Sequence, residues 1–429
     1  MRDRSKYVLG VLFVTFALNH LDRQVFGVLM EPIKNDLGLS DSAMGFLGGM
    51  SFALFHAIAG LPIARWADRS SRVRIIALGV AVWSVATTAT GFARNFAQMT
   101  VARVAVGIGE ASNGPASHSI ISDYFPLRRR ATALAVFFMG AHVGVLLGFT
   151  MGGWIAAQYG WRAAFFILGA PGLLVALLVW RTVPEPERGA AEPGAVDTSP
   201  LPWASVFRFL RTNPTFSFVL LGQAVHAFSA MGLLMWTAPL LMRLHDMDTA
   251  QAGLWIGPIA GISGALGVIG GGLLADRLGK RDARWYLRLP ALAALLGLPF
   301  TIAFIMSDST WLAILCLVPH AFLGGTYSGP IAAVVQSIVQ VRMRATAAAL
   351  NVIATSLIGV GLGPQVVGAL SDAFSASLGQ ESIRYAMLAV AVSNLLATAF
   401  YLLGSRGLKV STLEEHGLRS AAGGEENLQ

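Results

Sequence analysis

The sequence predicts an all-α membrane protein whose twelve transmembrane helices form two pseudo-symmetric six-helix bundles. The first observation behind this prediction is composition: of 429 residues, 55% are hydrophobic and only 13% are charged, whereas a soluble protein carries roughly 25% charged residues. The second is a series of long apolar runs, and the third is a pair of patterns that recur about half a chain apart. The 47 glycines agree with this class, because small residues let membrane helices pack closely.

Twelve apolar runs are long enough to cross a hydrocarbon core about 30 Å thick. They lie at residues 7–30, 42–66, 74–93, 97–122, 130–157, 162–182, 214–242, 250–275, 286–306, 309–337, 344–371 and 383–404. The stretch after the sixth run contains "VPEPERGAAEPG", whose proline, glycine and acidic residues cannot bury a core. We therefore expect an N-terminal bundle, a cytoplasmic linker, a C-terminal bundle and a cytoplasmic tail, over residues 1–182, 183–213, 214–404 and 405–429.

The basic N-terminus could also begin a signal peptide. The apolar run that follows is long and lacks a small-residue cleavage site, so we expect it to be the first membrane helix. With the loops placed alternately on the two sides, the side with both termini carries 24 of the 31 Lys and Arg residues and the other side carries five. Because basic loops stay in the cytoplasm, we expect a multi-pass inner-membrane protein with both termini cytoplasmic. This distribution explains the net charge of +8 without a nucleic-acid partner.

Two patterns of the first half recur in the second half. "GLPIARWADRSSRVR" at 60–74 and "GGLLADRLGKR" at 271–281 share Ala-Asp-Arg followed by a short basic turn. "RRRATALAVFFMGAHVGVLLG" at 128–148 and "RMRATAAALNVIATSLIGVGLG" at 342–363 share Arg-Ala-Thr and a later Gly-x-x-x-Gly. The offsets are 208 and 214 residues, about one six-helix half. Two patterns at nearly one offset indicate a duplicated half, which is typical of transporters with a site between the halves.

The Ala-Asp-Arg loops predict a gate at the cytoplasmic face. The first turn of a helix has unpaired N–H groups and a partial positive charge, so Asp68 could cap the helix that starts near Arg344. Asp276 could likewise cap the helix that starts near Arg130. Each contact would cross between the halves and contribute about 1–3 kcal/mol; the alternative is a solvated turn with an ordinary cap. The residues assigned to this gate are Asp68, Arg69, Arg72, Arg130, Asp276, Arg277 and Arg344.

Four charged residues lie well inside predicted helices, all in the N-terminal half. Asp22 and Arg23 belong to the first helix, and Arg103 and Glu110 to the fourth. Arg103 and Glu110 are seven residues apart, so they share one helical face, and the helical rise places the first-helix pair between them in depth. Because a charge in lipid is costly, these side chains should face a cavity, a partner or a proton path. The alternative is two static ion pairs, Asp22 with Arg103 and Arg23 with Glu110.

Several of these segments resemble a known family. The Asp-Arg loop after the second helix is the signature of the major facilitator superfamily. The chain resembles this superfamily over its whole length. Five segments resemble the Spinster branch of this superfamily, and the chain resembles a bacterial-type member of that branch. The segments are "NHLDRQ", "PIARWADR", "RVAVGIGEAS", "ISDYFPLRRRATALAVFFMGAHVGVLLG" and "GWRAAF...GAPGLL". Members of that branch transport lysolipids or sphingoid phosphates, some with protons. The resemblance implies the major facilitator fold and places the branch's functional charges on Asp22, Arg23, Arg103 and Glu110.

Charge chemistry suggests how these residues would work. A carboxylate beside an arginine stays ionised, whereas a desolvated and unpaired one takes up a proton. Protonation and conformation are coupled if Arg103 pairs with Asp22 in only one conformation. We therefore predict proton coupling at Asp22 and Glu110, and binding of an anionic headgroup such as phosphate at Arg23 and Arg103. Phe149 stands where the antiporter motif of helix five has proline, which favours symport over antiport.

The C-terminal half has no charged residue well inside a helix apart from histidines. Its expected cavity faces are apolar and rich in methionine, which suits the tail of an amphiphile whose head contacts the N-terminal half. For each single residue, ordinary helix packing is the alternative. The remaining predicted substrate contacts are Asn19, Ser117, His142, Phe228, Met231, Trp236, Tyr327 and Asn351.

The leading prediction is a monomeric, proton-coupled secondary transporter of lysolipid-like or sphingoid amphiphiles that works by alternating access among membrane lipids. One alternative is a proton-coupled exporter of small drugs or metabolites, and another is a passive lipid scramblase or a non-transporting sensor. No nucleophile–base set or cofactor loop is found, so we expect neither an enzyme nor a cofactor. The histidines show no metal-ligand spacing, and the single cysteine, Cys316, can form no intramolecular disulfide.

Overall fold

The computed structural model describes residues 2–188, 209, 212–339 and 350–408. Across these residues the chain is built from helices, and no strand is found among them. Each predicted run is one helix or consecutive helical pieces separated by a short break. The predicted all-α membrane fold is therefore confirmed.

The six runs of the N-terminal half are formed by the following elements. They are α1 (Arg2–Val28), α2 (Met30–Leu37), α3 (Asp41–Gly48), α4 (Met50–Arg69), α5 (Arg72–Thr90), α6 (Phe96–Glu110), α7 (Asn113–Tyr124), α8 (Leu127–Tyr159), α9 (Trp161–Gly169) and α10 (Pro171–Thr182).

The C-terminal half contains α-helices, two π-helical pieces (η1 and η3) and a short 3₁₀ turn (η4). The elements are α12 (Pro214–Leu244), α13 (Thr249–Pro258), η1 (Ile259–Ser263), α14 (Gly264–Gly279), α15 (Trp285–Met306), α16 (Thr310–Gly325), α17 (Ser328–Ile338), η3 (Thr355–Leu362), α19 (Gly363–Leu378), η4 (Gly379–Glu381), α20 (Ser382–Val392) and α21 (Asn394–Arg406).

Length and apolarity identify most of these helices as membrane spans. In the described part of the chain, nine helical stretches are long and apolar enough to cross a membrane, and the last of them, Leu350–Arg406, covers described parts of the last two predicted runs. The two predicted runs that fall outside these stretches are α1 and the pair α6–α7. These are the helices that carry the intramembrane charges, so their lower apolarity has a specific cause.

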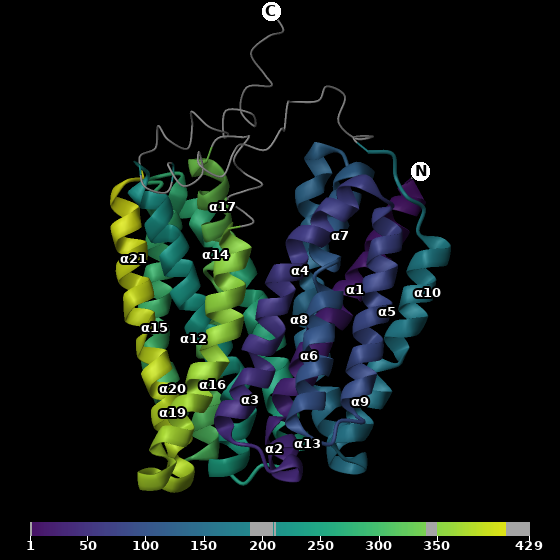
Figure 1. The fold of residues 1–429 in the computed structure, drawn as a ribbon. Helices are drawn as coiled ribbons and strands as arrows, with labels where there is room; N and C mark the ends of the chain where they lie inside the picture. Colours follow the sequence, from purple (N-terminus) through teal and green to yellow (C-terminus); the bar gives the residue numbers. More distant parts are fainter. Residues whose placement is uncertain (1, 189–208, 210–211, 340–349, 409–429) are drawn as a thin grey trace, which may run out of the picture.

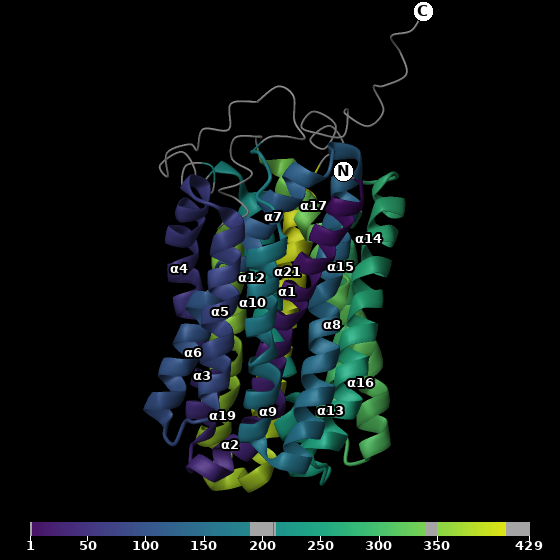
Figure 2. The same ribbon diagram turned by 90° about the vertical axis from the view of Figure 1, so that its right-hand side faces the viewer.

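The two halves stand side by side with their helices roughly parallel (Figure 1). We call the face where α1 begins and α10 and α21 end the terminal face, and the opposite face, where α2 lies, the far face; Figure 2 shows the same arrangement from the side. One large buried apolar cluster contains residues of both halves, including Phe149 and Trp236. The buried residues of two further clusters lie in one half each, around Trp83 and around Tyr401, and Val360 of the C-terminal half packs against the first.

The duplicated Gly-x-x-x-Gly pattern produces the same packing in both halves. A Cβ at Gly144 of α8 would lie 2.2 Å from the carbonyl oxygen of Ala17 on α1. A Cβ at Gly363 of α19 would lie 2.4 Å from the carbonyl oxygen of Phe228 on α12. Only glycine allows backbones to approach this closely. The repeated sequence therefore corresponds to a repeated helix contact, fifth on first and eleventh on seventh.

Glycines also bring the two halves together. A Cβ at Gly253 of α13 would lie 2.2 Å from the carbonyl oxygen of Phe149 on α8, and one at Gly45 of α3 would lie 2.6 Å from that of Pro364 on α19. Phe149 itself is fully buried at this contact. The pairs α8–α13 and α3–α19 thus join the halves on the far-face side of the bundle.

Candidate functional site

Helices α1 and α6 bring the four intramembrane charges into one cluster. Arg23 donates a hydrogen bond from Nε to Oε2 of Glu110 at 2.7 Å. The Glu110 side chain is fully buried, whereas 22% of the Arg23 side chain is exposed. Of the two ion pairs considered from the sequence, this one is formed, and the Arg23 side chain remains partly exposed.

The other pair, Asp22 with Arg103, is not formed in this conformation. Arg103 donates from Nε to the carbonyl oxygen of Leu47 at 3.2 Å, and its guanidinium carbon lies 4.6 Å from the centre of the Phe26 ring. Asp22 is 3% exposed and accepts a hydrogen bond from Oγ1 of Thr87 at 3.2 Å. Asp22 thus forms no ion pair with any residue that the structure describes.

An aromatic ring that the sequence did not single out organises this cluster. The guanidinium carbons of Arg23 and Arg103 lie 4.5 and 5.5 Å from the centre of the Phe52 ring on α4. A cation over a ring face is stabilised by the ring quadrupole, most strongly where water is excluded. Phe52 therefore positions both arginines between helices one, two and four. An apolar residue in an apolar helix offers no sequence signal for this role.

Asn19 and Ser117, the two polar residues predicted beside the charges, are both buried. Asn19 is 2% exposed and lies about one turn before Arg23 on α1. Ser117 is fully buried, and its hydroxyl donates to Oδ1 of Asn113 at 3.0 Å. Thr15 of α1 donates to the same oxygen at 3.3 Å. Ser117 therefore belongs to a contact between α1 and α7.

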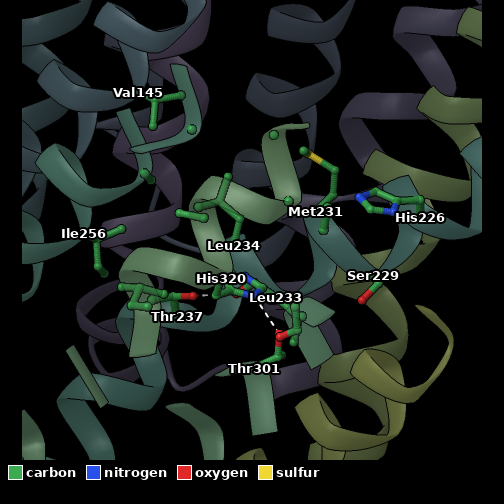
Figure 3. Close-up of a pocket in the computed structure, with 18 of the residues that line it drawn as sticks. Val145, His226, Ser229, Met231, Leu233, Leu234, Thr237, Ile256, Thr301 and His320 are labelled. Atoms are coloured by element: carbon green, nitrogen blue, oxygen red, sulfur yellow. Dashed lines mark hydrogen bonds between the residues drawn. The ribbon is translucent and has the colours of Figure 1, made fainter. Parts of the chain in front are cut away.

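A cavity of about 260 Å³ lies between the two halves (Figure 3). α1 and α8 contribute one wall, and α12, α15 and α16 contribute most of the other. Among the predicted substrate contacts, His142 and Met231 line this cavity. Most of its remaining lining is aliphatic or small, so it suits an apolar group of modest size.

The other predicted contacts of the C-terminal half lie outside the cavity lining. Trp236 is fully buried and donates from Nε1 to the carbonyl oxygen of Pro364 at 2.9 Å, so it packs within the contact between α12 and α19. The Tyr327 ring packs against the His226 ring at a tilt of 39°, with ring centres 4.1 Å apart. Phe228 and Asn351 are likewise absent from the lining. An apolar helix has several faces, and the sequence pattern alone did not identify the one that faces the cavity.

Sequence reasoning missed most of the polar residues that do line the cavity. They include His20, His226, Thr301 and Asn394. These residues come from α1, α12, α15 and α21, so no spacing along the chain could have grouped them. Among the described residues, no cluster of His, Cys, Asp or Glu has the arrangement of a metal site.

An ionic network closes the far face between the halves. Arg243 at the end of α12 donates from Nη1 and Nη2 to the two carboxylate oxygens of Asp41, each at 2.7 Å, and from Nε to Glu31 at 2.8 Å. Lys34 lies 2.7 Å from the same Asp41 carboxylate. The Arg243 and Asp41 side chains are 9% and 4% exposed. Bidentate contacts of this kind are among the strongest polar interactions in proteins.

A helix cap accompanies this network. Asp372 of α19 accepts hydrogen bonds from the backbone N–H groups of Asp41 and Ser42 at 3.0 and 2.7 Å. These groups belong to the first turn of α3, whose partial positive charge favours a carboxylate. The structure therefore contains the type of cross-half cap that the sequence predicted for the cytoplasmic face, but between other residues and at the far face.

The comparisons with known proteins agree with this architecture. Residues 12–364 match the family model described as the Major Facilitator Superfamily. The chain belongs to this superfamily. An MFS-type efflux pump of Mycolicibacterium smegmatis is 33% identical, over 96% of this chain and 95% of its own. Protein spinster homolog 1 of Xenopus laevis is 27% identical, over 93% of this chain and 80% of its own.

A solved structure of similar fold is a bacterial homolog of the human lysosomal transporter Spinster, in an inward-facing and unoccupied conformation. It is 34% identical, has a TM-score of 0.86 and covers 95% of this chain and 98% of its own. The resemblance to the Spinster branch is thereby confirmed. The chain is a Spinster-like membrane transporter of the Major Facilitator Superfamily, not an enzyme.

The superfamily's Asp-Arg loops do not bridge the halves of this transporter in the described residues. Asp276 accepts a hydrogen bond from the hydroxyl of Tyr286 at 2.8 Å, within its own half, and does not cap α8. Arg130 donates from Nη2 to the carbonyl oxygen of Ser122 at 2.8 Å, also within its own half. Arg69 and Arg277 are exposed, and the Asp68 side chain and Arg344 lie outside the described residues.

Arg72, also assigned to the gate, is buried in the N-terminal half. It forms an ion pair with Asp123 and donates from Nε to Glu185 at 2.8 Å and from Nη1 to Ser119 at 2.6 Å. Its partners lie on α7 and just after α10, so it fastens these segments to the start of α5. In this conformation Arg72 stabilises one half of the transporter and makes no contact between halves.

The first residues after α10 bind the loop between α4 and α5. Glu185 accepts hydrogen bonds from the backbone N–H of Val73 at 2.9 Å and from the hydroxyl of Ser71 at 2.7 Å, in addition to Arg72. Partial burial opposes its charge, but these donors outweigh burial and hold the pKa of Glu185 below its usual range. Arg188 donates to the carbonyl oxygen of Ala67 at 2.6 Å. Both ends of the Asp-Arg loop are thus anchored to the start of the linker.

Proposed function

We propose that this protein is a proton-coupled secondary active transporter of lysolipid-like or sphingoid amphiphiles that works by alternating access. The observation that carries the proposal is Asp22, a buried carboxyl with a neutral hydroxyl as its hydrogen-bond donor, beside the ion pair of Arg23 and Glu110. A carboxyl in such surroundings binds a proton much more readily than one in water. The apolar cavity between the halves suits the tail of an amphiphile whose head contacts the charges of the N-terminal half.

We infer that the terminal face is cytoplasmic and that the protein is a monomer in the inner membrane. The excess of basic residues on that side supports this orientation. The far face is closed by Arg243 and Asp41, whereas the contacts of Arg72 and Asp276 at the terminal face lie within one half each. The conformation then opens toward the cytoplasm, in agreement with the inward-facing relative of similar fold.

The coupling step follows from the two possible partners of Arg103. In the conformation described here, Arg103 contacts a carbonyl oxygen and two rings, and Asp22 binds a proton. In the other conformation, Arg103 approaches Asp22 and favours its ionised form, so the proton leaves. An anionic headgroup at Arg23 and Arg103 would compete for the same guanidinium groups. Proton release and substrate binding are therefore linked through shared arginines.

The cytoplasmic gate remains part of the proposal. When the terminal face closes, Asp68 would cap the helix near Arg344, and Asp276 would exchange Tyr286 for the start of α8. The far-face cap by Asp372 would then open. Each cap would stabilise one of the two conformations, and substrate and protons would shift the balance between them.

The test is uptake of a labelled lysophospholipid into liposomes with and without a pH gradient. We expect Asp22→Asn and Glu110→Gln each to abolish the acceleration by the gradient, because neither amide can release a proton. Asp36→Asn is the matched control: Asp36 pairs with Arg162 at the far face, its side chain is 45% exposed, and the variant should remain coupled. Normal gradient dependence in both Asp22→Asn and Glu110→Gln would refute proton coupling through this cluster.

A second candidate is proton-coupled export of small drugs or metabolites. The modest cavity of about 260 Å³ and the similarity to an efflux pump favour it. Competition separates the two candidates: a lysophospholipid displaces a fluorescent drug only if it binds the same cavity. Accumulation against a gradient that an uncoupler abolishes would exclude a passive scramblase or a sensor.

A further inference from the structure

Two residues that line the cavity between the halves have a buried polar atom without a hydrogen-bond partner among the described residues. Nδ1 of His226 and Oδ1 of Asn394 are buried, and neither has a hydrogen-bond partner among the residues that the structure describes. Both residues line the cavity, and His226 is only 3% exposed. Buried polar atoms in native proteins are almost always paired. Two unpaired atoms in one cavity therefore point to a partner that the cavity receives.

The hydrogen bond already made identifies Oδ1 of Asn394 as an acceptor. Asn394 donates from Nδ2 to the hydroxyl oxygen of Ser229 at 2.9 Å, so its carbonyl oxygen is the unpaired atom. Nδ1 of the neutral His226 ring accepts a hydrogen bond when the ring hydrogen is on Nε2.

Two further histidines of the cavity have the same arrangement. Nδ1 of His20 lies 3.1 Å from the carbonyl oxygen of Phe16, so it carries the hydrogen. The hydroxyl of Thr301 donates to Gly297 at 2.9 Å, and Nδ1 of His320 therefore donates to that hydroxyl oxygen at 2.7 Å. In each neutral ring Nε2 is left with a lone pair. The lining thus carries acceptors on α1, α12, α16 and α21.

The lining also limits the charge of a ligand group. It contains histidines, the fourth being His142, but no Asp, Glu, Lys or Arg. A cation would lose its water without gaining a counter-charge, and an anion would face lone pairs. A neutral group with a hydrogen to donate satisfies the acceptors at the lowest desolvation cost. Among such groups, the hydroxyl is small enough to accompany an apolar chain into this cavity.

We propose that His226 and Asn394 form a subsite that binds a free hydroxyl of the transported substrate. This inference rests on the proposed function and adds a specificity determinant to it. A single-chain phospholipid carries a free glycerol hydroxyl next to its phosphate, whereas a diacyl phospholipid has that oxygen esterified. With the phosphate near Arg23 and Arg103, the hydroxyl subsite would select single-chain substrates by chemistry as well as by size.

The test compares two probes that differ in one hydroxyl, a monoacylglycerol phosphate of short acyl chain and its deoxy analogue. Binding to the full-length protein in detergent is measured at one pH. We expect the wild type to bind the hydroxylated probe about three- to tenfold more tightly, as one buried hydrogen bond allows. Asn394→Leu and His226→Phe, which keep approximate size, should each reduce this preference toward one.

The matched control is Thr237→Val. Thr237 lines the same cavity, but its hydroxyl already donates to Leu233 of its own helix at 2.8 Å, so this variant should keep the wild-type preference. The melting temperature of each variant establishes that it is folded, and the two subsite variants test the inference independently. Equal affinity of the wild type for both probes would overturn the hydroxyl subsite alone. Failure of the wild type to bind either probe would overturn the proposed substrate class, and this inference with it.

Discussion

Asp22 and Glu110 are both buried acids of one cluster, yet their partners differ. Glu110 receives a charge-assisted hydrogen bond from Arg23 at 2.7 Å, whereas Asp22 receives one from a neutral threonine at 3.2 Å. An ionised carboxylate is stabilised by the first arrangement and poorly by the second. In the proposed coupling scheme, Asp22 rather than Glu110 therefore carries the proton in this conformation. Phe52 contributes by holding both arginines of the cluster.

Glu185 provides a residue-scale prediction on stability and pH. Because its pKa lies below the usual range, its hydrogen bonds stabilise the folded protein above the pKa of an unfolded glutamate. This contribution disappears as the pH falls through the lowered pKa. We expect Glu185→Gln to reduce the Tm at neutral pH by about 1–3 °C, measured by thermal unfolding in detergent.

The pH series provides the discriminating measurement. The difference in Tm between the wild type and Glu185→Gln should shrink as the pH falls below about 4.5. Glu187→Gln, two residues further along the same exposed segment, should leave the Tm unchanged at every pH. A difference for Glu185→Gln that is constant with pH would contradict an electrostatic role for this carboxylate.

Closely packed glycines define the contacts between helices. The glycines of α8 allow α1 of the same half to approach closely. Gly253 of α13 allows α8 of the opposite half to approach closely. The contact between α8 and α13 joins the two halves in this conformation, so we expect it to stabilise the closed far face. The contact between α8 and α1 lies within one half and can persist in both. Sequence repeats predicted the glycine patterns, but the cross-half contact involves a glycine outside them.

Gly253→Val should therefore destabilise the closed far face. The added Cβ would meet backbone at 2.2 Å, which cannot rotate away. Overpacking of this kind costs about 1–3 kcal/mol, so the equilibrium should move roughly 5- to 150-fold toward the conformation with the far face open. Pulsed spin-label distances between Phe92, which follows α5, and Trp311, at the start of α16 in the opposite half, would report the change, with Cys316 replaced; both side chains are exposed.

Gly272→Val is the control on the same predicted helix. A Cβ at Gly272 would meet nothing within 4 Å, so the distance distribution should match that of the labelled wild type. An unchanged distribution in Gly253→Val as well would mean that the α8–α13 contact does not decide the conformation.

For the whole molecule, the far face combines a shared apolar cluster, a bidentate ion pair and a helix cap. The terminal face of the described residues has separate clusters in the two halves and polar contacts within each half. This asymmetry explains why the halves are joined on one side. Because the far-face groups become accessible to water when that face opens, their interactions stabilise the closed arrangement specifically.

Arg243→Gln tests the ionic part of this closure. Removing the arginine leaves Asp41 with Lys34 as its one cationic partner among the described residues and removes the ion pair of Glu31, a loss that in buried pairs amounts to about 3–5 kcal/mol. We expect a large shift toward the conformation with the far face open, in the same distance measurement. Arg162→Gln is the matched control, because Arg162 pairs with Asp36 inside one half and both side chains are more than one-third exposed. Equal distances in the Arg243 and Arg162 variants would contradict this role for Arg243.

The sequence alone determined the class of this protein, and it predicted twelve apolar runs, a duplicated half and the intramembrane charges. These follow from local properties: apolar length decides whether a segment can span lipid, and a charge within such a segment stands out because it is costly. Tertiary structure decided which charge pairs with which, that Trp236 packs away from the cavity, and that Arg243, Asp41 and Asp372 close the far face. It also grouped the histidines and Asn394 around one cavity. Such groupings depend on how separate helices rotate and approach one another, and spacing along the chain does not encode that geometry.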